Sequence, residues 1–412
     1  MTISLCRRYI FQLLVFFLPT QLALHFWPDW AHIYGFRVDY LSPTIFFTDI
    51  LVFLLFILWI ISKRKIKQRK EFFILLIGFS LVNIYLAKNP EVSLFKWVKI
   101  TEIIFISFFI ATEKSFKLLE WVIKPLMFSL ITVSLIAFGQ FILQRTIGGP
   151  LYLLGERSFT VSTPGISRFS FFGREFLRPY STFPHPNALG GFMAVCFFLL
   201  LCGAKEGLKR KPIFKISLIF TLATLILSVS HAAWISFILA STLLIFRKKK
   251  IFKKFYVLLV TLTVIVSLLL PVISVKLLSL FDYPEEISRR LLLSKAAGIM
   301  IAGNPLIGVG AGNFILRLTD ISGLPKVSWW FQPVHNIFLL TLSETGFMGL
   351  GALLFLVVLV MKKVLLQKEK IFLSIPFLII ILTGFADHYW LTLQQTQLLL
   401  GILGGLIFKK KV

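Results

Sequence analysis

The stretch that decides the fold is HNIFLLTLSETGFMGLGALLFLVVLVM, residues 335–361, an apolar run in which Glu344 is the only charged residue. A helix needs about 20 consecutive apolar residues to cross the hydrocarbon core of a bilayer, and this run is longer than that. The rest of the chain has the same character. Of its 412 residues, 57% are hydrophobic and 15% are charged, against about 45–50% and about 25% in ordinary soluble domains. This composition excludes a soluble or disordered protein.

Apolar runs recur along the whole chain and predict about twelve transmembrane helices. They lie near 9–26, 43–62, 72–87, 97–112, 119–142, 187–203, 212–229, 231–246, 255–275, 335–361, 371–385 and 390–408. We therefore expect an all-α polytopic membrane protein in which residues 1–412 form a single integral membrane domain. The alternative for 9–26 is a cleaved signal peptide, but no pattern of small residues marks a cleavage site after it.

The net charge of +26, from 44 Lys and Arg against 18 Asp and Glu, would suggest nucleic-acid binding in a soluble protein. In a membrane protein it reports topology, because cytoplasmic loops collect Lys and Arg. With twelve spans, most of the cationic residues fall on the side that holds both termini. Their groups are at 7–8, 63–70, 114–117, 205–211, 247–254, 362–370 and 409–411. We expect both termini to be cytoplasmic and no nucleic-acid partner.

Two long segments are left on the outer face, 143–186 and 276–334. Loops of this length are commonly functional. Both are cationic, against the usual trend for that side. Either long loops escape the charge rule, or these residues form an anion site at the outer face. The cations are Arg145, Arg157, Arg168, Arg174, Arg178, Lys276, Arg289, Arg290, Lys295, Arg317 and Lys326.

All the histidines also map to the outer side, several of them where a loop meets a span. Histidine titrates near neutral pH and is a common general acid or base, although it is also an ordinary interfacial anchor. The six are His25, His32, His185, His231, His335 and His388. The three cysteines, Cys6, Cys196 and Cys202, have no metal-like spacing and are interpreted as packing residues without a disulfide or zinc.

Two short outer motifs carry polar residues to the mouths of spans. In RPYSTFPHPNALGG (178–191), the prolines enforce an extended entry, Asn187 could cap the next helix, and Arg178 accompanies His185 near the depth of a lipid phosphate. In SVSHAAW (228–234), a tight hairpin holds His231 at the surface. Capping by Ser230 and anchoring by Trp234 explain this second motif equally well.

The second long loop predicts an amphipathic helix lying along the interface. Asp282 opens this motif, and Pro284 with two following acids indicates a first helical turn. Arg289 and Arg290 come next. The segment NPLIGVGAGNF (304–314) lacks the strand–turn–helix context of a dinucleotide site, but a glycine-rich turn could still let backbone approach a ligand.

The ends of the last spans hold further candidate site residues. His335 and Asn336 open the run 335–361, and Glu344 within it is an expensive, and therefore suggestive, intramembrane charge. The glycines Gly346, Gly349 and Gly351 are expected to allow close helix packing. Asp387 directly precedes His388 and could orient it.

The order and spacing of four motifs resemble the O-antigen ligase/O-antigen polymerase superfamily. They are R-x-x-S-T-F-x-H-P-N (178–187), S-x-S-x-x-A-W (228–234), R-L-x-x-x-K-A-A (290–297) and H-N-I-F-L-x-x-L-S-E-T-G-F-x-G (335–349). The resemblance implies a membrane glycosyltransferase of C-type helical architecture. Such an enzyme moves a glycan from undecaprenyl diphosphate to an acceptor on the outer side of the bacterial plasma membrane. It also implies that His335 is the catalytic base and that Arg290 binds diphosphate.

One position departs from the family pattern. Its hairpin usually reads Ser-Arg-Gly/Ala, whereas here it reads Ser230-His231-Ala232. Either His231 as a cation or Arg178 replaces the missing arginine, or the donor headgroup is held differently. We assign Arg178, Arg290, Arg289 and His231 to the diphosphate, with supporting roles for His185, Asn187, Asn336, Glu344, Asp387 and His388.

Elementary chemistry agrees with this assignment. A diphosphate leaving group needs a metal or guanidinium donors, and the outer segments carry no D-x-D motif or cluster of carboxylates. We therefore expect a metal-independent transferase without cofactors that inverts the anomeric centre by direct displacement.

The acceptor could be a lipid core, another lipid-linked glycan or a protein hydroxyl, which correspond to a ligase, a polymerase or a protein O-oligosaccharyltransferase. A transporter or flippase for lipid-linked polysaccharide is the alternative of another class. Asp49, Lys99, Glu102 and Glu344 partly fit it, but no internal repeat is evident.

Overall fold

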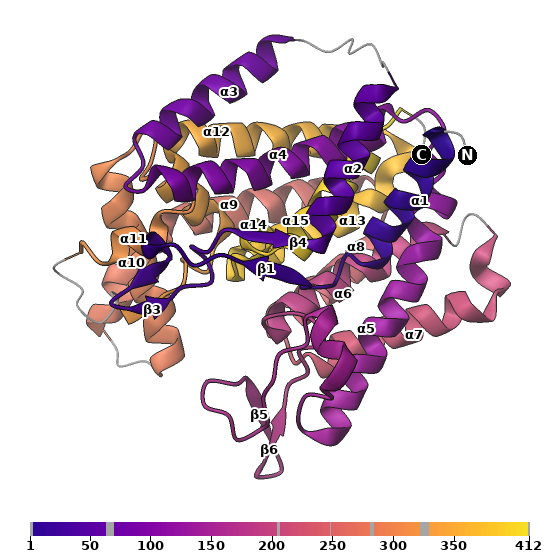
Figure 1. The fold of residues 1–412 in the computed structure, drawn as a ribbon, viewed down its shortest axis with the longest axis horizontal. Coiled ribbons are helices and arrows are strands. Elements are labelled where there is room, and N and C mark those ends of the chain that lie inside the picture. Colours follow the sequence, from indigo (N-terminus) through magenta and orange to yellow (C-terminus); the bar gives the residue numbers. More distant parts are fainter. Residues whose placement is uncertain are drawn as a thin grey trace.

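The computed structural model describes residues 3–62, 70–203, 207–247, 249–280, 284–321 and 329–410. These residues are mostly helical, and the strands among them form three two-stranded antiparallel ribbons. Figure 1 shows the long helices packed side by side, with the β5–β6 hairpin projecting from one edge. Lys205, Lys326, Asp282 and the cationic group at 63–69 lie outside the described residues.

The helices and strands follow one another along the chain with few long interruptions. The helices are α1 (Ile3–Phe16), α2 (Phe47–Ile61), α3 (Lys70–Tyr85), α4 (Pro90–Thr112), α5 (Lys124–Leu143), α6 (Pro186–Gly203), α7 (Pro212–Leu227), α8 (His231–Ile245), α9 (Lys250–Leu280), α10 (Glu285–Gly303), α11 (Phe314–Leu318), α12 (Ile337–Leu366), α13 (Ser374–Ala386), α14 (Tyr389–Thr392) and α15 (Gln394–Phe408). The strands are β1 (Ala23–His25), β2 (His32–Ile33), β3 (Phe36–Arg37), β4 (Thr44–Phe46), β5 (Arg168–Phe171) and β6 (Arg174–Leu177).

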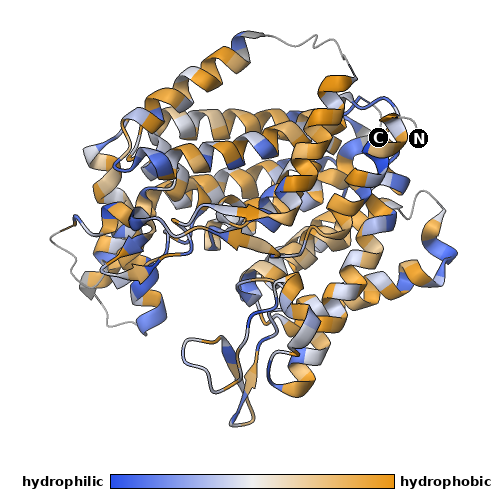
Figure 2. Cartoon of the chain, viewed as in Figure 1, coloured by the Kyte–Doolittle hydropathy of each residue, from blue (hydrophilic) through white to orange (hydrophobic). Residues whose placement is uncertain are grey.

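Four of the described helices are long and apolar enough to cross a membrane: Leu119–Leu143, Pro186–Gly203, Lys250–Leu278 and Ile337–Leu366. Shorter apolar helices lie at Phe47–Ile61, Phe73–Tyr85, Pro212–Leu227, His231–Ile245, Lys370–Ala386 and Gln394–Phe408. Figure 2 shows hydrophobic residues along nearly the full length of these helices. A helical multi-pass membrane protein is therefore confirmed, while twelve spans and cytoplasmic termini stay predictions.

The first apolar run does not form the helix expected over 9–26. Helix α1 ends at Phe16, before Pro19, and residues 23–25 form β1, which pairs with β4 in the register Ala23↔Phe46 and His25↔Thr44. Proline lacks the backbone N–H that a continuing helix needs. Apolar content alone does not distinguish a strand from a helix in so short a stretch, so the prediction was wrong here.

Helix α4 begins earlier than expected, at Pro90, and its residues Lys99 and Glu102 lie among the packed helices. Asn89 caps it, with Oδ1 accepting from the Val92 N–H at 2.8 Å. The Lys99 ammonium pairs with the Asp49 carboxylate of α2 and lies 3.8 Å from Glu102 Oε2. Buried charges are tolerable when they are paired in this way. These residues therefore form a closed ionic cluster.

The predicted helix after Pro284 is confirmed as α10, which begins at Glu285.

The glycine-rich segment that follows α10 packs against helix α12 where that helix is broken. Helix α12 is broken at Gly346, where φ is 65°. Val309 N donates to Ser343 O at 2.9 Å, Gly310 N donates to Glu344 O at 3.0 Å, and Phe347 N donates to Pro305 O at 2.8 Å. The segment 304–313 thus bonds the backbone groups that the break releases.

Asn83 of α3 forms hydrogen bonds both to the segment 304–313 and to α12 where they meet. Its Nδ2 donates to Ile307 O at 2.9 Å and to Glu344 O at 3.0 Å, and its Oδ1 accepts from Ala311 N at 3.0 Å. The approach is too close for side chains. A Cβ at Gly308 would lie 2.4 Å from the Glu344 carbonyl carbon, and one at Gly346 would lie 2.3 Å from that of Leu306. These glycines serve backbone-to-backbone packing.

Replacing Gly346 with Ala is expected to lower the free energy of unfolding by about 1–3 kcal/mol, because an L residue is strained at positive φ and its Cβ would overlap Leu306. Thermal unfolding in detergent micelles measures this loss. Gly351→Ala in the same helix is the matched control, since nothing lies within 4 Å of a Cβ there, and it should be neutral or slightly stabilising. Equal stability of the two variants would contradict the assignment.

Candidate active site

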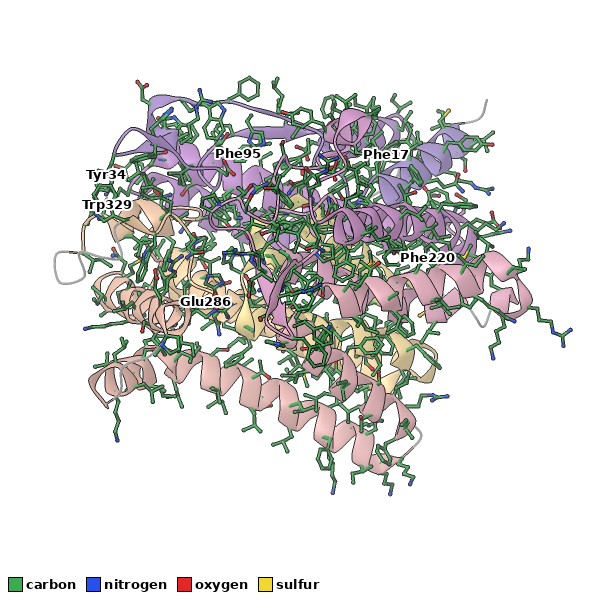
Figure 3. All side chains as sticks on the ribbon, turned by 90° about the horizontal axis from the view of Figure 1, so that it is seen from below. Phe17, Tyr34, Phe95, Phe220, Glu286 and Trp329 are labelled. Carbon is green, nitrogen blue, oxygen red and sulfur yellow. The ribbon has the colours of Figure 1, made fainter. Side chains whose placement is uncertain are left out.

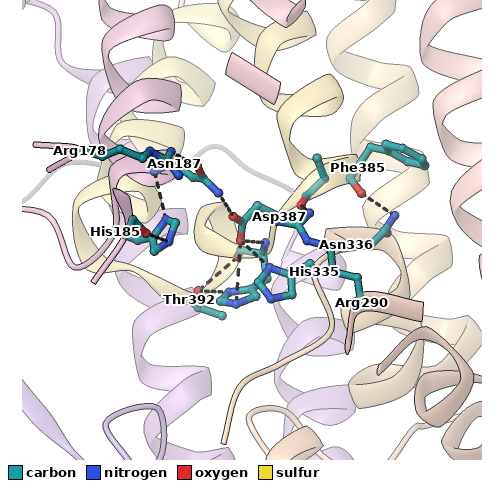
Figure 4. Close-up of polar contacts among 12 residues, drawn as sticks. Arg178, His185, Asn187, Arg290, His335, Asn336, Phe385, Asp387 and Thr392 are labelled. Carbon is teal, nitrogen blue, oxygen red and sulfur yellow. Dashed lines mark hydrogen bonds and ion pairs between the residues drawn. The ribbon is translucent and has the colours of Figure 1, made fainter. Parts of the chain in front are cut away.

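Three helix junctions bring the predicted residues together. His335 precedes α12, Asp387 and His388 join α13 to α14, and His185 precedes α6. These side chains line a cavity of about 830 Å³, together with Asn187, Arg290 and Glu344. The volume lies within the usual range of ligand pockets, about 300–1,000 Å³. Figure 4 shows Arg178 and Arg290 on opposite sides of the group formed by Asp387, His335 and Thr392.

His335 is held by Asp387, with Nδ1 lying 3.3 Å from Oδ1. Burial by itself would raise the pKa of the Asp387 carboxyl, but the His335 imidazole, through its charge and its hydrogen bond, holds that pKa below its usual range. The carboxylate is therefore ionised and can only accept a hydrogen bond. This places the proton of a neutral His335 on Nδ1 and leaves Nε2 as a free acceptor, the arrangement that a general base requires.

His388 is oriented mainly by a residue other than Asp387. Its Nδ1 pairs with Thr392 Oγ1 at 2.8 Å, whereas its Nε2 is 3.9 Å from Asp387 Oδ1. The backbone N–H of His388 donates to Asp387 Oδ1 at 2.8 Å. Burial lowers the pKa of His388 to about 3, outweighing the opposing effect of Asp387. The expectation that Asp387 orients the His388 ring is thus revised: Asp387 contacts His335 more closely.

His185 is a neutral structural partner. Its Nδ1 accepts from Asn187 N at 3.1 Å, and its Nε2 pairs with Ser167 Oγ at 3.0 Å. Burial lowers the pKa of His185 to about 4, so the ring is uncharged at neutral pH. The expectation that Asn187 caps α6 is wrong, because the His185 ring bonds the free N–H there and the Asn187 side chain is used elsewhere.

Arg178 is connected to Asp387 through Asn187. The Arg178 guanidinium donates from Nε to Ser228 O at 2.9 Å and from Nη2 to Asn187 Oδ1 at 2.6 Å. Asn187 Nδ2 then donates to Asp387 Oδ2 at 3.4 Å. Arg178 is half-buried and does not itself line the cavity. Arg178 therefore acts on the site indirectly, through its hydrogen bond to Asn187.

Of the described arginines assigned to the diphosphate, Arg290 lines the cavity, whereas Arg178 and Arg289 do not. Its Nη1 donates to Ala386 O at 2.9 Å, and the exposed guanidinium keeps other N–H groups available. Arg289 instead pairs with Glu285 at 2.8 Å and lies over the Trp330 ring at 5.2 Å. One arginine of the adjacent pair is therefore aimed at the site and the other is aimed away from it.

His231 lies away from the cavity lining. It is exposed at the start of α8, with its ring 5.9 Å from that of Trp234. Ser230 Oγ caps the helix by accepting from Ala233 N at 3.4 Å, and Trp234 Nε1 donates to Leu225 O at 2.9 Å. The hairpin contacts are those of capping and anchoring, and they give no support to a diphosphate role for His231.

Asn336 and Glu344 support the site in different ways. Asn336 Oδ1 caps α12, and its Nδ2 donates to Ser267 Oγ at 3.0 Å and Phe385 O at 3.1 Å. This ties the start of α12 to the end of α13 and so sets His335 beside Asp387. Glu344 is buried and lines the deep part of the cavity, with Oε1 3.4 Å from Phe314 N.

Several lining residues were not singled out from the sequence. Tyr40 lies edge-on to His388, with ring centroids 5.5 Å apart. Lys96 of α4 donates to Leu391 O at 2.5 Å and faces the same cavity. These residues come from segments far apart in the chain. No local spacing marks them, although the aromatic content of 26–40 was a partial signal.

One group of described residues has the spacing of metal ligands. One ligand atom each from His335, Asp387 and His388 lies within 4.8 Å of the others. Imidazole and carboxylate suit zinc and related transition metals. A search of the sequence for clustered carboxylates could not find this group, because two of its three members are histidines and one comes from another helix junction. Cys196 and Cys202 are buried.

The buried neutral His388 predicts an acid-labile fold. Because the pKa of His388 is about 3 in the folded chain, against about 6.5 when unfolded, the unfolded state binds more protons below pH 6.5. Stability should be complete above about pH 6.5 and fall as the pH drops toward 3. Thermal unfolding against pH checks this. His388→Gln should show a smaller fall over that window, and a fall as large as in the unchanged protein would contradict the burial assignment.

Comparison with known proteins gives one finding for part of the chain. No curated protein matches the chain. The O-antigen ligase family model matches residues 216–354, which run from α7 into α12 and include His231, Arg290 and His335. The match covers about a third of the chain. Residues 216–354 are therefore similar to the O-antigen ligase family, in agreement with the resemblance of the sequence motifs.

Proposed function

We propose that the protein is a membrane glycosyltransferase that moves a glycan from undecaprenyl diphosphate to an acceptor hydroxyl at the outer face of the bacterial plasma membrane. The family implies an enzyme of the ligase or polymerase type. The observation that carries the proposal is the contact of His335 Nδ1 with the buried Asp387 carboxylate, in a cavity that also exposes Arg290. The contact prepares a base, and the cavity offers an anion-binding group beside it.

The reaction is a direct displacement. Nε2 of His335 accepts the proton of the acceptor hydroxyl as its oxygen forms a bond to the anomeric carbon. The bond from that carbon to the diphosphate oxygen breaks, and the diphosphate leaves with the electron pair. The configuration of the anomeric carbon is inverted. Asp387 stabilises the imidazolium that forms, because the ionised carboxylate lies 3.3 Å from Nδ1.

The guanidinium groups stabilise the leaving diphosphate. A guanidinium presents several N–H donors in a planar fork that matches phosphate oxygens. Arg290 projects into the cavity, and Arg178 stands behind Asn187. Arg289 and His231 have less support, since each packs against an indole ring outside the cavity lining.

Removing the base is the direct test. His335→Ala should lower transfer from a lipid-linked donor by about a hundredfold or more, the usual contribution of general-base catalysis, with little effect on donor KM. The measurement is glycan transfer by purified protein in lipid nanodiscs. His32→Ala is the matched control, because His32 contacts Pro28 O at 3.1 Å and does not line the cavity. Normal transfer by folded His335→Ala protein would refute the assignment.

Metal independence is tested separately. We expect purified protein to keep full transfer activity in excess chelator, because guanidinium groups supply the charge that an ion would otherwise provide. The opposite outcome has a structural basis, because His335, Asp387 and His388 have the spacing of metal ligands. Loss of activity in chelator that zinc or manganese restores would replace this part of the proposal with a metal-assisted reaction.

The acceptor type divides the remaining alternatives. A lipid A core acceptor makes the protein a ligase, a second lipid-linked glycan makes it a polysaccharide polymerase, and a peptide hydroxyl makes it a protein O-oligosaccharyltransferase. A transporter would move the lipid-linked glycan without forming a glycosidic bond. The buried or half-buried charged groups of Asp49, Lys99, Glu102 and Glu344 are the features that favour transport, but Lys99 is paired with both Asp49 and Glu102.

A further inference from the structure

The cavity extends beyond the histidines to a second wall. Residues between α1 and α2 form much of it, together with residues 152–157 before β5. We define the outer wall as Trp27, Asp39, Tyr40, Tyr152 and Arg157, all of which line the cavity. Pairing of β1 with β4 and of β2 with β3 fixes the segment that carries the first three; β1, β3 and β4 are labelled in Figure 1. The wall is thus a folded part of the site.

The outer wall combines aromatic surface with a balanced pair of charges. Tyr152 is 69% exposed. Trp27 is supported by the His25 ring, stacked at 5.7 Å, and by the Arg37 guanidinium at 5.1 Å. The Asp39 carboxylate and the Arg157 guanidinium are both exposed and lie 3.3 Å apart. An ion pair of zero net charge suits neutral hydroxyl groups better than it suits a phosphate.

The outer wall begins beside the catalytic group. The Tyr40 ring is 5.5 Å from the His388 ring, which is 5.1 Å from the His335 ring. Among the described residues, no hydrogen bond uses the Tyr40 hydroxyl. A ligand resting on this wall at Tyr40 therefore lies close to His335. At about 830 Å³ the cavity has room for more than the donor headgroup.

We propose that the outer wall is the acceptor subsite and that it binds a sugar ring whose free hydroxyl is delivered to Nε2 of His335. Apolar C–H faces of a sugar pack on tyrosine and tryptophan rings, while its hydroxyls bond Asp39 and Arg157. This inference rests on the proposed glycosyl transfer, because a base at His335 needs an acceptor hydroxyl next to it. It commits to a glycan acceptor, supplied either by a lipid core or by a second lipid-linked chain.

Two surface substitutions test the subsite. Tyr152→Ala and Asp39→Asn should each raise the acceptor KM about tenfold, equivalent to ~1.4 kcal/mol, while kcat and donor KM stay within about twofold. Both residues are exposed, so folding should be unaffected. The matched control is Tyr34→Ala, which removes a 52%-exposed tyrosine that lies against Trp329, at 4.7 Å, outside the cavity. Figure 3 shows that pair at the edge of the molecule.

The assay is run with purified protein and two acceptors, a lipid A core glycan and a lipid-linked glycan. If the substitutions raise the KM for one of the two acceptors, the subsite is supported, and that acceptor is identified as the source of the bound sugar. Unchanged acceptor KM in both variants, while His335→Ala abolishes transfer, overturns the subsite and leaves the proposed function intact. Efficient transfer to a serine peptide with a KM that neither substitution alters also overturns it. Transfer that survives His335→Ala would instead count against the proposed function.

Discussion

The break in helix α12 at Gly346 is the constraint on which much of the structure depends. A helix that turns out of its path inside an apolar layer leaves carbonyl and N–H groups that no water can bond. The segment 304–313 supplies these bonds, and Asn83 of α3 clamps both chains. Because this contact joins α3, α10 and α12, it fixes the second outer loop relative to the membrane helices.

That attachment has a direct consequence for chemistry. Helix α10 carries Arg290, and helix α12 begins just after His335, so joining the two helices sets both side chains along the same cavity. Asn336 then ties the start of α12 to the end of α13, which Asp387 follows. Arg290, His335 and Asp387 thus lie in or next to helices, and their relative positions follow from how those helices pack.

Electrostatics divides the histidines by role. The surroundings of His185 and His388 lower the pKa values of both rings, so both are uncharged at neutral pH. Their ring nitrogens are used in contacts with Ser167, Asn187 and Thr392. His335 is half-buried and faces the ionised Asp387, so it combines access with a fixed tautomer. Three chemically identical side chains within one cavity are therefore suited to different tasks.

The sequence by itself determined the membrane class, nearly all the helix positions, and His335, Arg290 and Asp387 as candidates, because hydropathy and local motifs act over short stretches. It could not distinguish Arg289 from Arg290, since which of two neighbours faces the cavity depends on the helix packed behind them. It also missed Tyr40, and it paired Asp387 with its neighbour in sequence, His388, when the closer ring is that of His335. Only the tertiary structure decided these points, because each depends on contacts between residues far apart in the chain.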